Sequence, residues 1–401
     1  MTRIAYIATY PPKKCGIATY THHLRQSVKS ARQWKFTDTV YALTDGAAAE
    51  NYTDPSVHPL PKNDRQAYRK AAQRINAGDA DVVSLQHEFG IFGGGEAGEY
   101  VLEFLGRLDK PVVTTFHTVF EEPPEPYASV QREIANLSDK IVVMNRKAIA
   151  LLTRAFHIPE EKIVFIPHGA PAPVPEKRAE LREAFGWRDR RVIMTFGLLS
   201  RGKGLELVIR ALPDVIRKVP NALYAILGQT HPEVRKREGE SYREELQAFI
   251  RDLGLENHVV MIDRYVDEEE LVHYLTACDL YVTPYPGMQQ ITSGTLAYAV
   301  GLGRPVLTTP YSHAQDLLGD WRDELLLPYG DTKAWAERIA GMLSDPNRMR
   351  LWEERMRTIG ASLHWPRVGA VHANLFRETA LQARYEPRAK AAGQSLSNRE
   401  V

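Results

Sequence analysis

Residues 196–204 combine two cations with several glycines in a form that suits an anion. Arg201 and Lys203 stand one glycine apart, and Ser200 precedes them near the start of a predicted helix. Amides at a helix N-terminus attract anions, and charge-assisted hydrogen bonds are stronger than neutral ones. The segment therefore predicts a site for the phosphates of a diphosphate, the alternative being two solvated loop cations. A Walker-type loop is excluded because GxxxxGK followed by Ser or Thr does not occur.

A second segment, 291–295, has the composition of a helix start beside a phosphate. Its sequence is Ile-Thr-Ser-Gly-Thr, so Ser293, Gly294 and Thr295 would offer amides and hydroxyls to a phosphate oxygen. The simpler interpretation is that the hydroxyls only cap the helix. Both interpretations require a helix that begins at about this point.

The loop 10–17 follows the first predicted strand and has a glycine, Gly16, next to its last residue. Gly16 would let the chain approach a ligand at the N-terminus of the next helix, where amides favour an anion. GxGxxG is absent here, and Pro11 and Pro12 remove two amide donors. A nicotinamide-dependent dehydrogenase is therefore a weak hypothesis, and an ordinary strand-to-helix turn is the alternative for this loop.

Polar side chains also end two predicted strands in the first half of the chain. His87 and Glu88 follow one of them, ahead of the glycine run 93–95, and His117 ends another. A carboxylate such as Glu88 can accept hydrogen bonds from sugar hydroxyls. The alternatives are a solvated turn for the first pair and a structural role for His117.

These segments lie where an α/β protein would place a ligand, because ligands bind beyond the carboxyl ends of strands in open sheets. Short β-branched runs alternate with segments of helical period, which predicts parallel sheets covered by helices. The predicted strands are 3–9, 36–43, 81–86, 111–116, 140–144 and 163–166, then 191–196, 222–228, 258–262, 279–283, 305–309 and 324–327. Helices are expected after Gly16, near Glu96 and Ala128, and after the N-caps Asn145 and Asp267.

A proline-rich segment at 166–175 separates two halves of similar layout. We therefore predict an N-terminal Rossmann-like, acceptor-side domain at 1–168 and a C-terminal Rossmann-like, donor-binding domain at 177–360. A helical tail runs from about residue 347 to 385. The end of the chain, 386–401, has too few apolar residues to pack and is expected to fray.

Composition narrows the class of protein. The chain has 401 residues, 44% of them hydrophobic, and a formal net charge of +1, which argues against a polyanion-binding surface. No apolar stretch reaches the length of a membrane span, and no secretory signal precedes the first strand. Cys15 and Cys278 have no metal-type spacing. We therefore expect a cytoplasmic protein without a structural metal or disulfide framework.

Several short motifs follow one another along nearly the whole chain. They are Pro11-Pro12 to Gly16, Phe116-His117, Ile166-Pro167-His168-Gly169, Phe196-Gly197 to Lys203-Gly204, Asp279 to Pro284, Ala299 to Gly303 with Pro305-Val306, and Gly330-Asp331. In order and spacing they resemble the retaining glycosyltransferases of the two-Rossmann-domain (GT-B) type, family 4. The resemblance implies an α/β fold with two Rossmann-like domains facing across a cleft, each with a parallel sheet flanked by helices.

The resemblance also implies roles for particular residues. Arg201 and Lys203 would hold the donor phosphates, with Gly16 beside them across the cleft. His117 would face the donor sugar as a catalytic residue, and His87 and Glu88 are expected on the acceptor side. The C-terminal helix, 361–385, with a start near Trp365-Pro366 as the family suggests, would cross back onto the first domain.

One departure from the family concerns its two glutamates, which lie eight positions apart. The corresponding positions are Gln290, expected to contact the donor sugar and take part in catalysis, and Tyr298, expected near the nucleotide. An amide can still donate to and accept from sugar hydroxyls, but a phenol cannot grip a ribose diol as a carboxylate does. Phosphate recognition by Ser293, Gly294 and Thr295 is expected to remain.

These observations lead to one main hypothesis and two alternatives. The main one is a retaining, metal-independent glycosyltransferase that moves a hexosyl unit from a nucleotide-sugar, such as UDP- or GDP-hexose, to a sugar or glycoconjugate acceptor without a cofactor. The first alternative is a glycoside phosphorylase or a transferase that uses a sugar 1-phosphate, suggested by Tyr298. The second is a non-catalytic protein that binds a glycan or nucleotide-sugar. Neither nucleic acid nor a membrane span is expected as part of the function.

Overall fold

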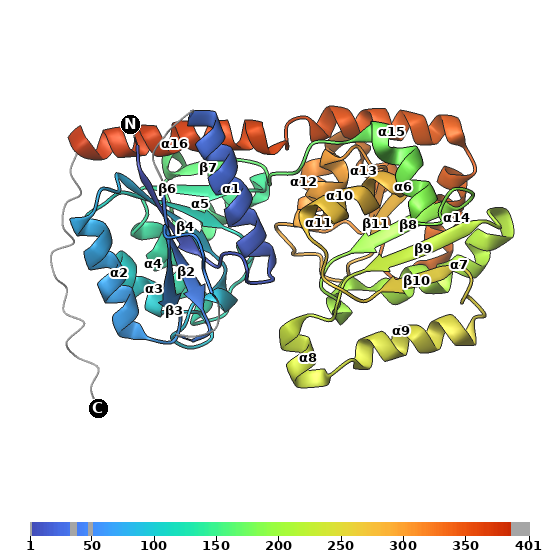
Figure 1. Cartoon of the computed structure of the whole chain (residues 1–401), viewed down its shortest axis with the longest axis horizontal. Coiled ribbons are helices and arrows are strands. Elements are labelled where there is room, and N and C mark those ends of the chain that lie inside the picture. Colours follow the sequence, from blue (N-terminus) through green and yellow to red (C-terminus); the bar gives the residue numbers. More distant parts are fainter. Residues whose placement is uncertain (1, 33–37, 47–50, 386–401) are drawn as a thin grey trace. The chain divides into compact units, whose positions relative to one another are not determined.

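A computed structural model describes residues 2–32, 38–46 and 51–385 of the chain. The fold divides into two compact units, one of Met1–Pro167 with Pro366–Val401 and one of His168–Trp365. Each unit is built on one parallel sheet with helices around it (Figure 1). The N-terminal unit is therefore completed by the last described helix, residues 365–385.

The N-terminal unit holds a seven-stranded parallel sheet of order β3-β2-β1-β4-β5-β6-β7. Its strands are β1 (Ile4–Ala8), β2 (Thr39–Thr44), β3 (Val57–Pro61), β4 (Val82–His87), β5 (Val112–Phe116), β6 (Lys140–Val143) and β7 (Ile163–Phe165). Its helices are α1 (Gly16–Arg32), α2 (Arg65–Ala77), α3 (Tyr100–Leu105), α4 (Tyr127–Asn136), α5 (Arg146–Phe156) and α16 (Trp365–Tyr385), with short 3-10 turns η1 (Phe89–Ile91) and η2 (Glu160–Lys162). Strands β1, β4 and β5 are buried along their whole length, as parallel strands covered on both faces must be.

The second unit holds a five-stranded parallel sheet of order β10-β9-β8-β11-β12. Its strands are β8 (Arg191–Phe196), β9 (Ala222–Leu227), β10 (Val259–Ile262), β11 (Leu280–Thr283) and β12 (Val306–Thr308). Its helices are α6 (Arg178–Ala184), α7 (Leu205–Lys218), α8 (Pro232–Glu238), α9 (Ser241–Asp252), α10 (Glu268–Ala277), α11 (Gly294–Gly301), α12 (Ser312–Leu318), α13 (Arg322–Leu325), α14 (Thr332–Leu343) and α15 (Pro346–Gly360), with 3-10 turns η3 (Pro175–Lys177), η4 (Arg201–Lys203) and η5 (Gly319–Trp321).

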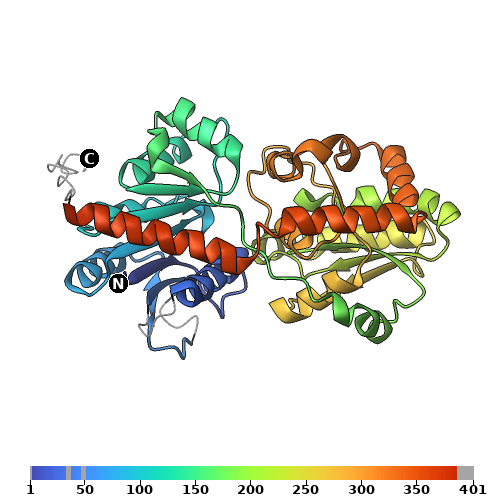
Figure 2. The ribbon, with the colours of Figure 1, turned by 90° about the horizontal axis from the view of Figure 1, so that it is seen from above.

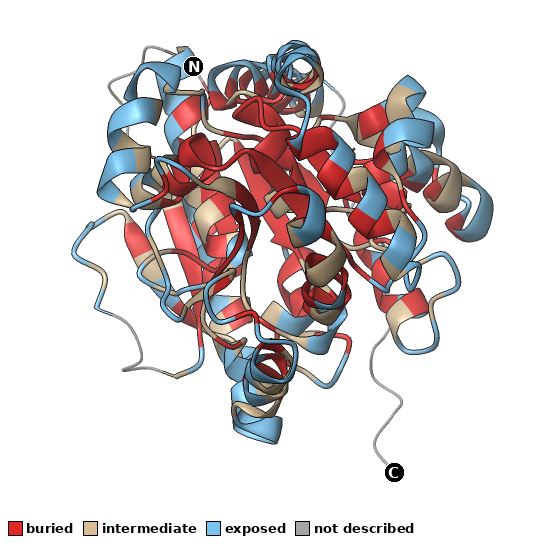
Figure 3. Cartoon of the chain, turned by 90° about the vertical axis from the view of Figure 1, so that its right-hand side faces the viewer, coloured by how far each residue is buried: buried red, intermediate tan, exposed pale blue. Residues whose placement is uncertain are grey.

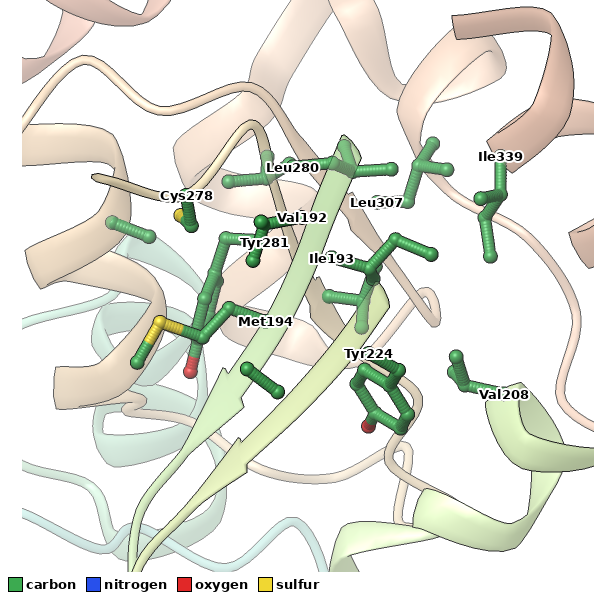
Figure 4. Packing of buried hydrophobic residues seen from close by; sticks show 14 of the residues in the cluster. Val192, Ile193, Met194, Val208, Tyr224, Cys278, Leu280, Tyr281, Leu307 and Ile339 are labelled. Carbon is green, nitrogen blue, oxygen red and sulfur yellow. The ribbon is translucent and has the colours of Figure 1, made fainter. Parts of the chain in front are cut away.

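Burial follows the sheets. Most strands are almost wholly buried, whereas the longer helices show one buried and one exposed face (Figure 3). In the second unit, side chains of β8, β9 and β11 pack against helices on either side, as Ile193, Tyr224 and Leu280 show (Figure 4). This core fixes the carboxyl ends of β8, β11 and β12, and the loops that follow these strands carry the candidate site.

Helix α16 packs on the N-terminal unit, along which it runs in Figure 2. Phe376 stacks edge-on against Tyr6 of β1 with ring centroids 6.4 Å apart. A Cβ on Gly369 would come 2.6 Å from the backbone of Ser27, so only glycine permits this approach to α1. Arg384 pairs with Asp81 at 2.7 Å. The predicted helix start near Trp365 agrees with the observed one.

Several sequence predictions need correction. Residues 324–327 are not a strand: α13 occupies Arg322–Leu325, and only an isolated bridge joins Leu326 to Thr308. Strand β3 was not predicted, and the helix expected near Glu96 begins at Tyr100. The predicted helical tail consists of two helices, α15 and α16.

Parts of two other predictions fall outside the described residues. The strand predicted at 36–43 is observed at Thr39–Thr44, and positions 36 and 37 are not described. The tail at 386–401 likewise lies outside the described residues.

Candidate functional site

A chain of hydrogen bonds joins the basic loop after β8 to the start of α11. Lys203 Nζ donates to the Tyr285 hydroxyl at 3.0 Å, and that hydroxyl is 2.9 Å from Thr295 Oγ1. Thr295 Oγ1 is in turn 3.1 Å from Ser293 Oγ. Gly197 lies among these groups, because a Cβ there would be 3.6 Å from Lys203 Nζ and 3.5 Å from the Thr295 methyl. The structure thus brings together a cation and three hydroxyls, all within the second unit.

The start of α11 leaves two amides open. Ser293 is the N-cap, and its hydroxyl accepts from the Leu296 amide at 3.3 Å. The Gly294 and Thr295 amides donate to no other group among the described residues. Open amides at the first turn of a helix favour an anion. The predicted capping role of Ser293 and its predicted place beside a phosphate are therefore compatible.

The start of α7 differs, because side chains of α9 and of α7 itself already lie against it. The Leu205 amide donates to the Tyr242 hydroxyl at 3.0 Å, and that hydroxyl donates to Glu206 at 2.5 Å. The Lys203 and Gly204 amides bond within the loop. Of the two predicted phosphate-binding loops, the one at α11 offers the free helix terminus.

Arg201 points to a different partner from Lys203. Its guanidinium donates to Glu245 of α9 at 2.6 Å and lies over the Tyr242 ring at 5.4 Å. The side chain is 57% exposed, and the hydrogen bond to Glu245 raises its pKa. The structure therefore separates Arg201 from the hydroxyl cluster that Lys203 joins.

Two histidines to which the sequence analysis gave no role in the site flank the start of α11. His313, in the first turn of α12, accepts the Ser293 amide at Nδ1 over 2.7 Å. His168 Nε2 would lie 3.0 Å from a Cβ on Gly294. Burial and, to a smaller extent, the neighbouring His168 lower the pKa of His313 to about 3. His313 could have been found by the rule that directed attention to strand ends, because it follows β12.

Gln290 and Tyr298 lie close to the same helix start but in different surroundings. Gln290 is half-buried, and its side-chain amide donates to the Thr292 carbonyl at 3.0 Å. Tyr298 is buried on α11, and its hydroxyl donates to Glu268 at 2.7 Å. Burial, followed by the Glu268 charge, raises the pKa of Tyr298 well above its ordinary value. A carboxylate, Glu268, thus lies one hydrogen bond from the tyrosine that replaces the expected glutamate.

In the N-terminal unit, His117, His87 and Glu88 meet at the ends of β4 and β5. The His117 amide donates to the His87 carbonyl at 3.0 Å, and Nε2 of the His117 ring is 2.9 Å from Gln86 Oε1. Glu88 accepts from Thr118 Oγ1 at 2.7 Å. Desolvation raises the pKa of Glu88 above its ordinary value despite that hydrogen bond.

His87 itself has no exposed surface. Phe89, Phe92 and Phe116 surround its ring, with centroids 4.8 to 5.6 Å away. Neither ring nitrogen has a hydrogen-bond partner among the described residues, and burial lowers its pKa to about 3. An acceptor sugar could reach this ring only if the aromatic cage moved.

Gly16 begins α1, as predicted. The Ala18 amide is 3.4 Å from Cys15 Sγ, and no atom lies within 4 Å of a Cβ built on Gly16. Tyr20, one turn further along, contacts the His117 ring edge-on at 4.8 Å. The start of α1 and the β4–β5 cluster are therefore neighbours within the N-terminal unit.

Within residues 2–32, 38–46 and 51–385, no group of three or more His, Cys, Asp or Glu could hold a metal ion. Over the same residues, every helix is too short or too polar to cross a bilayer.

Two family models match adjoining parts of the chain. Residues 16–172 match the model described as Glycosyltransferase Family 4. Residues 177–359 match the model described as Glycosyl transferases group 1. The first match covers most of the sheet of the N-terminal unit and the second covers most of the second unit, whereas α16 lies outside both.

Curated relatives and solved structures agree with these matches. The chain is 29% identical over 226 residues to the GDP-mannose-dependent α-(1-6)-phosphatidylinositol monomannoside mannosyltransferase of Mycolicibacterium smegmatis, covering 54% of this chain and 56% of that relative. The chain thus spans little more than half the length of that relative. The Mycobacterium tuberculosis protein of the same name is 24% identical, covering 94% of this chain and 98% of its own.

The solved structure of Anabaena HepE in complex with UDP and glucose has a TM-score of 0.71 at 17% identity. The superposition covers 94% of this chain and 100% of that one. The predicted α/β fold, with two parallel sheets flanked by helices and of the GT-B type, is confirmed.

Proposed function

This chain belongs to the group 1 and family 4 glycosyltransferases, and from that premise we propose that it moves a hexosyl unit from a nucleotide-sugar to a carbohydrate acceptor. Two relatives are named as GDP-mannose-dependent mannosyltransferases, and a structural neighbour contains UDP and glucose. These names support a nucleotide-sugar donor. Retention of the anomeric configuration is part of the proposal.

The observation that carries the proposal is the start of α11. Lys203 reaches Thr295 and Ser293 through Tyr285, beside the open amides of Gly294 and Thr295. When a sugar leaves its donor, negative charge grows on the departing phosphate. Fixed hydrogen-bond donors on the protein that point at that charge stabilise the transition state more than the ground state. In this arrangement Lys203 and the α11 amides bind and neutralise the leaving phosphate.

A nucleotide release assay tests this proposal. The protein is incubated with UDP-, GDP- and ADP-hexoses and a panel of sugar acceptors, and the free nucleoside diphosphate is measured. We expect nucleotide release from at least one sugar donor. Lys203→Met should lose about a hundredfold to a thousandfold in kcat, since one oxyanion-stabilising hydrogen-bond donor contributes that much. The matched control is Lys236→Met, which removes an exposed cation of α8 that pairs with Glu233. Unimpaired turnover in Lys203→Met contradicts the role of this site.

Tyr298 favours a second candidate, a phosphorylase or a transferase that uses a sugar 1-phosphate. The α11 amides that would bind a phosphate do not require a nucleoside in the ligand. Tyr298 offers a phenol where a carboxylate would hold a ribose diol. Glu268 beside Tyr298 supports the nucleotide donor instead, because its carboxylate could take that role. Calorimetry separates the two: binding of hexose 1-phosphate without binding of UDP, GDP or ADP supports the second candidate.

A further inference from the structure

His313 ties α12 to the start of α11 through its side chain. The loop between β11 and α11 is already held by two backbone bonds, from the Ser312 amide to Met288 and from the His313 amide to Gln290, each 3.0 Å long. The third bond, from the Ser293 amide to His313 Nδ1 at 2.7 Å, is the one that depends on the histidine ring. It acts on the N-cap residue itself.

The environment fixes the state of this ring. A nitrogen that accepts an amide hydrogen carries no proton, so the neutral imidazole has its proton on Nε2. His313 is 3% exposed, and His168 is a second imidazole at the same helix start. His313 therefore keeps one tautomer, with Nδ1 always available as an acceptor.

The Ser293–His313 bond matters because the next two amides, of Gly294 and Thr295, are the ones proposed to bind phosphate. It takes the Ser293 amide out of the set of donors and fixes the N-cap, whose Oγ reaches Leu296 and Thr295. The Gly294 and Thr295 amides then keep a fixed direction beside Lys203. Donors that are already oriented bind an anion without a cost for ordering them.

We propose that His313 is a positioning residue that holds the start of α11 in its phosphate-binding geometry by accepting the Ser293 amide at Nδ1. The inference rests on the proposed function, because it assumes that the ligand carries phosphate. His313 acts through Ser293 rather than by touching the ligand.

Two substitutions of His313 distinguish the effect of its hydrogen-bond acceptor from the effect of its side-chain volume. His313→Asn places Oδ1 where Nδ1 lies and keeps the acceptor, whereas His313→Leu fills the space without one. The matched control, His372→Leu, removes a buried histidine of α16 in the N-terminal unit. UDP and GDP are titrated calorimetrically into each folded variant, and the unfolding midpoint of each is recorded.

We expect His313→Leu to weaken the affinity for the bound nucleoside diphosphate by about tenfold or more, because it leaves a buried amide unpaired. His313→Asn should stay within about threefold of the native protein, and His372→Leu should not change the affinity. Native affinity in His313→Leu, or equal losses in His313→Asn and His313→Leu, would overturn the proposal.

Two ligand-free measurements distinguish failure of this inference from failure of the proposed function. Nitrogen NMR of the imidazole should show the Nε2–H tautomer, and amide exchange at residues 293–296 should accelerate in His313→Leu but not in His313→Asn. A proton on Nδ1, or unchanged exchange in His313→Leu, contradicts the positioning role. If both results are as expected but neither UDP nor GDP binds the native protein, the proposed function fails and the positioning of α11 by His313 stands.

Discussion

His87 shows how far one buried residue can depart from the usual rule that buried polar groups are hydrogen-bonded. Its ring sits among three phenylalanines, and neither nitrogen has a partner among the described residues. An unpaired buried polar group costs about 1–3 kcal/mol. His87→Leu, which has similar volume and no polar atoms, should therefore raise the free energy of unfolding by about 1 kcal/mol in urea titrations at pH 7.

The control for this prediction is His117→Leu. His117 hydrogen-bonds Gln86, so its removal leaves a buried amide without that partner and should destabilise the protein. A loss of stability in His87→Leu comparable to that in His117→Leu would show that His87 makes an interaction the described residues do not account for.

The pH dependence of stability gives a second test of the buried, neutral state of His87. Burial lowers its pKa from 6.5 to about 3, so between these values the unfolded chain binds a proton that the folded protein does not. Stability therefore falls as the pH decreases from 6.5 toward 3, by about 1.4 kcal/mol per pH unit for one such group. Between pH 6 and pH 5, His87→Leu should lose less stability than the native protein by about that amount. Parallel pH profiles for the two proteins would be inconsistent with a buried neutral His87.

At the scale of elements, Asp279 joins α6 to the sheet of the second unit. Its carboxylate accepts from Arg178 at 2.7 Å, from Arg182 at 3.1 Å and from the Val192 amide at 2.7 Å. Removing one partner of a largely buried pair costs about 3–5 kcal/mol, and the partial exposure of both arginines favours the lower value. Asp279→Asn should lower the free energy of unfolding by about 3 kcal/mol.

The comparison for this variant is Asp214→Asn. Asp214 pairs with Arg217 on the exposed face of α7, and exposed pairs of this kind contribute less than about 1 kcal/mol. Equal effects of the two substitutions in denaturant titrations would show that the α6 network adds no more than a surface pair.

The elements with local signals were predictable, and those without were not. Asn145 and Asp267 cap α5 and α10 as predicted, because a cap is read from its own side chain and the residues after it. Strand β3 was missed because Pro59 and Pro61 argue against a strand, although an edge position tolerates them. The short apolar run at 324–327 did not distinguish a helix from a strand.

The candidate site was predictable in its parts but not in its pairings. Lys203 was selected because it follows a strand, and residues 293–295 because their composition suits a helix start beside a phosphate. The structure links them through Tyr285. The partner of Arg201 lies 44 positions away on α9, at Glu245, and no local pattern reveals it. The same holds for the Ser293–His313 and Tyr298–Glu268 bonds, which only the folded chain creates.

At the scale of the whole molecule, α16 completes the N-terminal unit although it follows the second unit in the sequence. Residues Val368, His372, Phe376 and Ala380 of α16 are buried at helical spacing, and Phe376 contacts Tyr6 of β1. The second unit, by contrast, is one continuous segment. Residues 168–365 expressed alone should therefore unfold cooperatively, whereas residues 1–167 alone should unfold at a lower midpoint than the same unit in the full chain.

Calorimetry and circular dichroism of the two fragments check this prediction. Addition of a peptide of residues 365–385 should restore stability to 1–167, because burial of its apolar face stabilises the sheet. An unchanged midpoint for 1–167 without α16 would show that the C-terminal helix adds nothing to the unit.

The near-zero net charge of the chain is compatible with its proposed ligand. A small phosphorylated substrate needs a few fixed hydrogen-bond donors on the protein rather than a broad basic surface. Lys203 and the α11 amides provide these hydrogen-bond donors. The central claim is that the donor phosphate binds at this helix start.

A crystal structure of the protein with UDP or GDP bound tests that claim most directly. We predict phosphate oxygens within hydrogen-bond distance of the Gly294 and Thr295 amides and of Lys203 Nζ, with Ser293 still bonded to His313. A diphosphate bound elsewhere, with the start of α11 left unoccupied, would contradict the account.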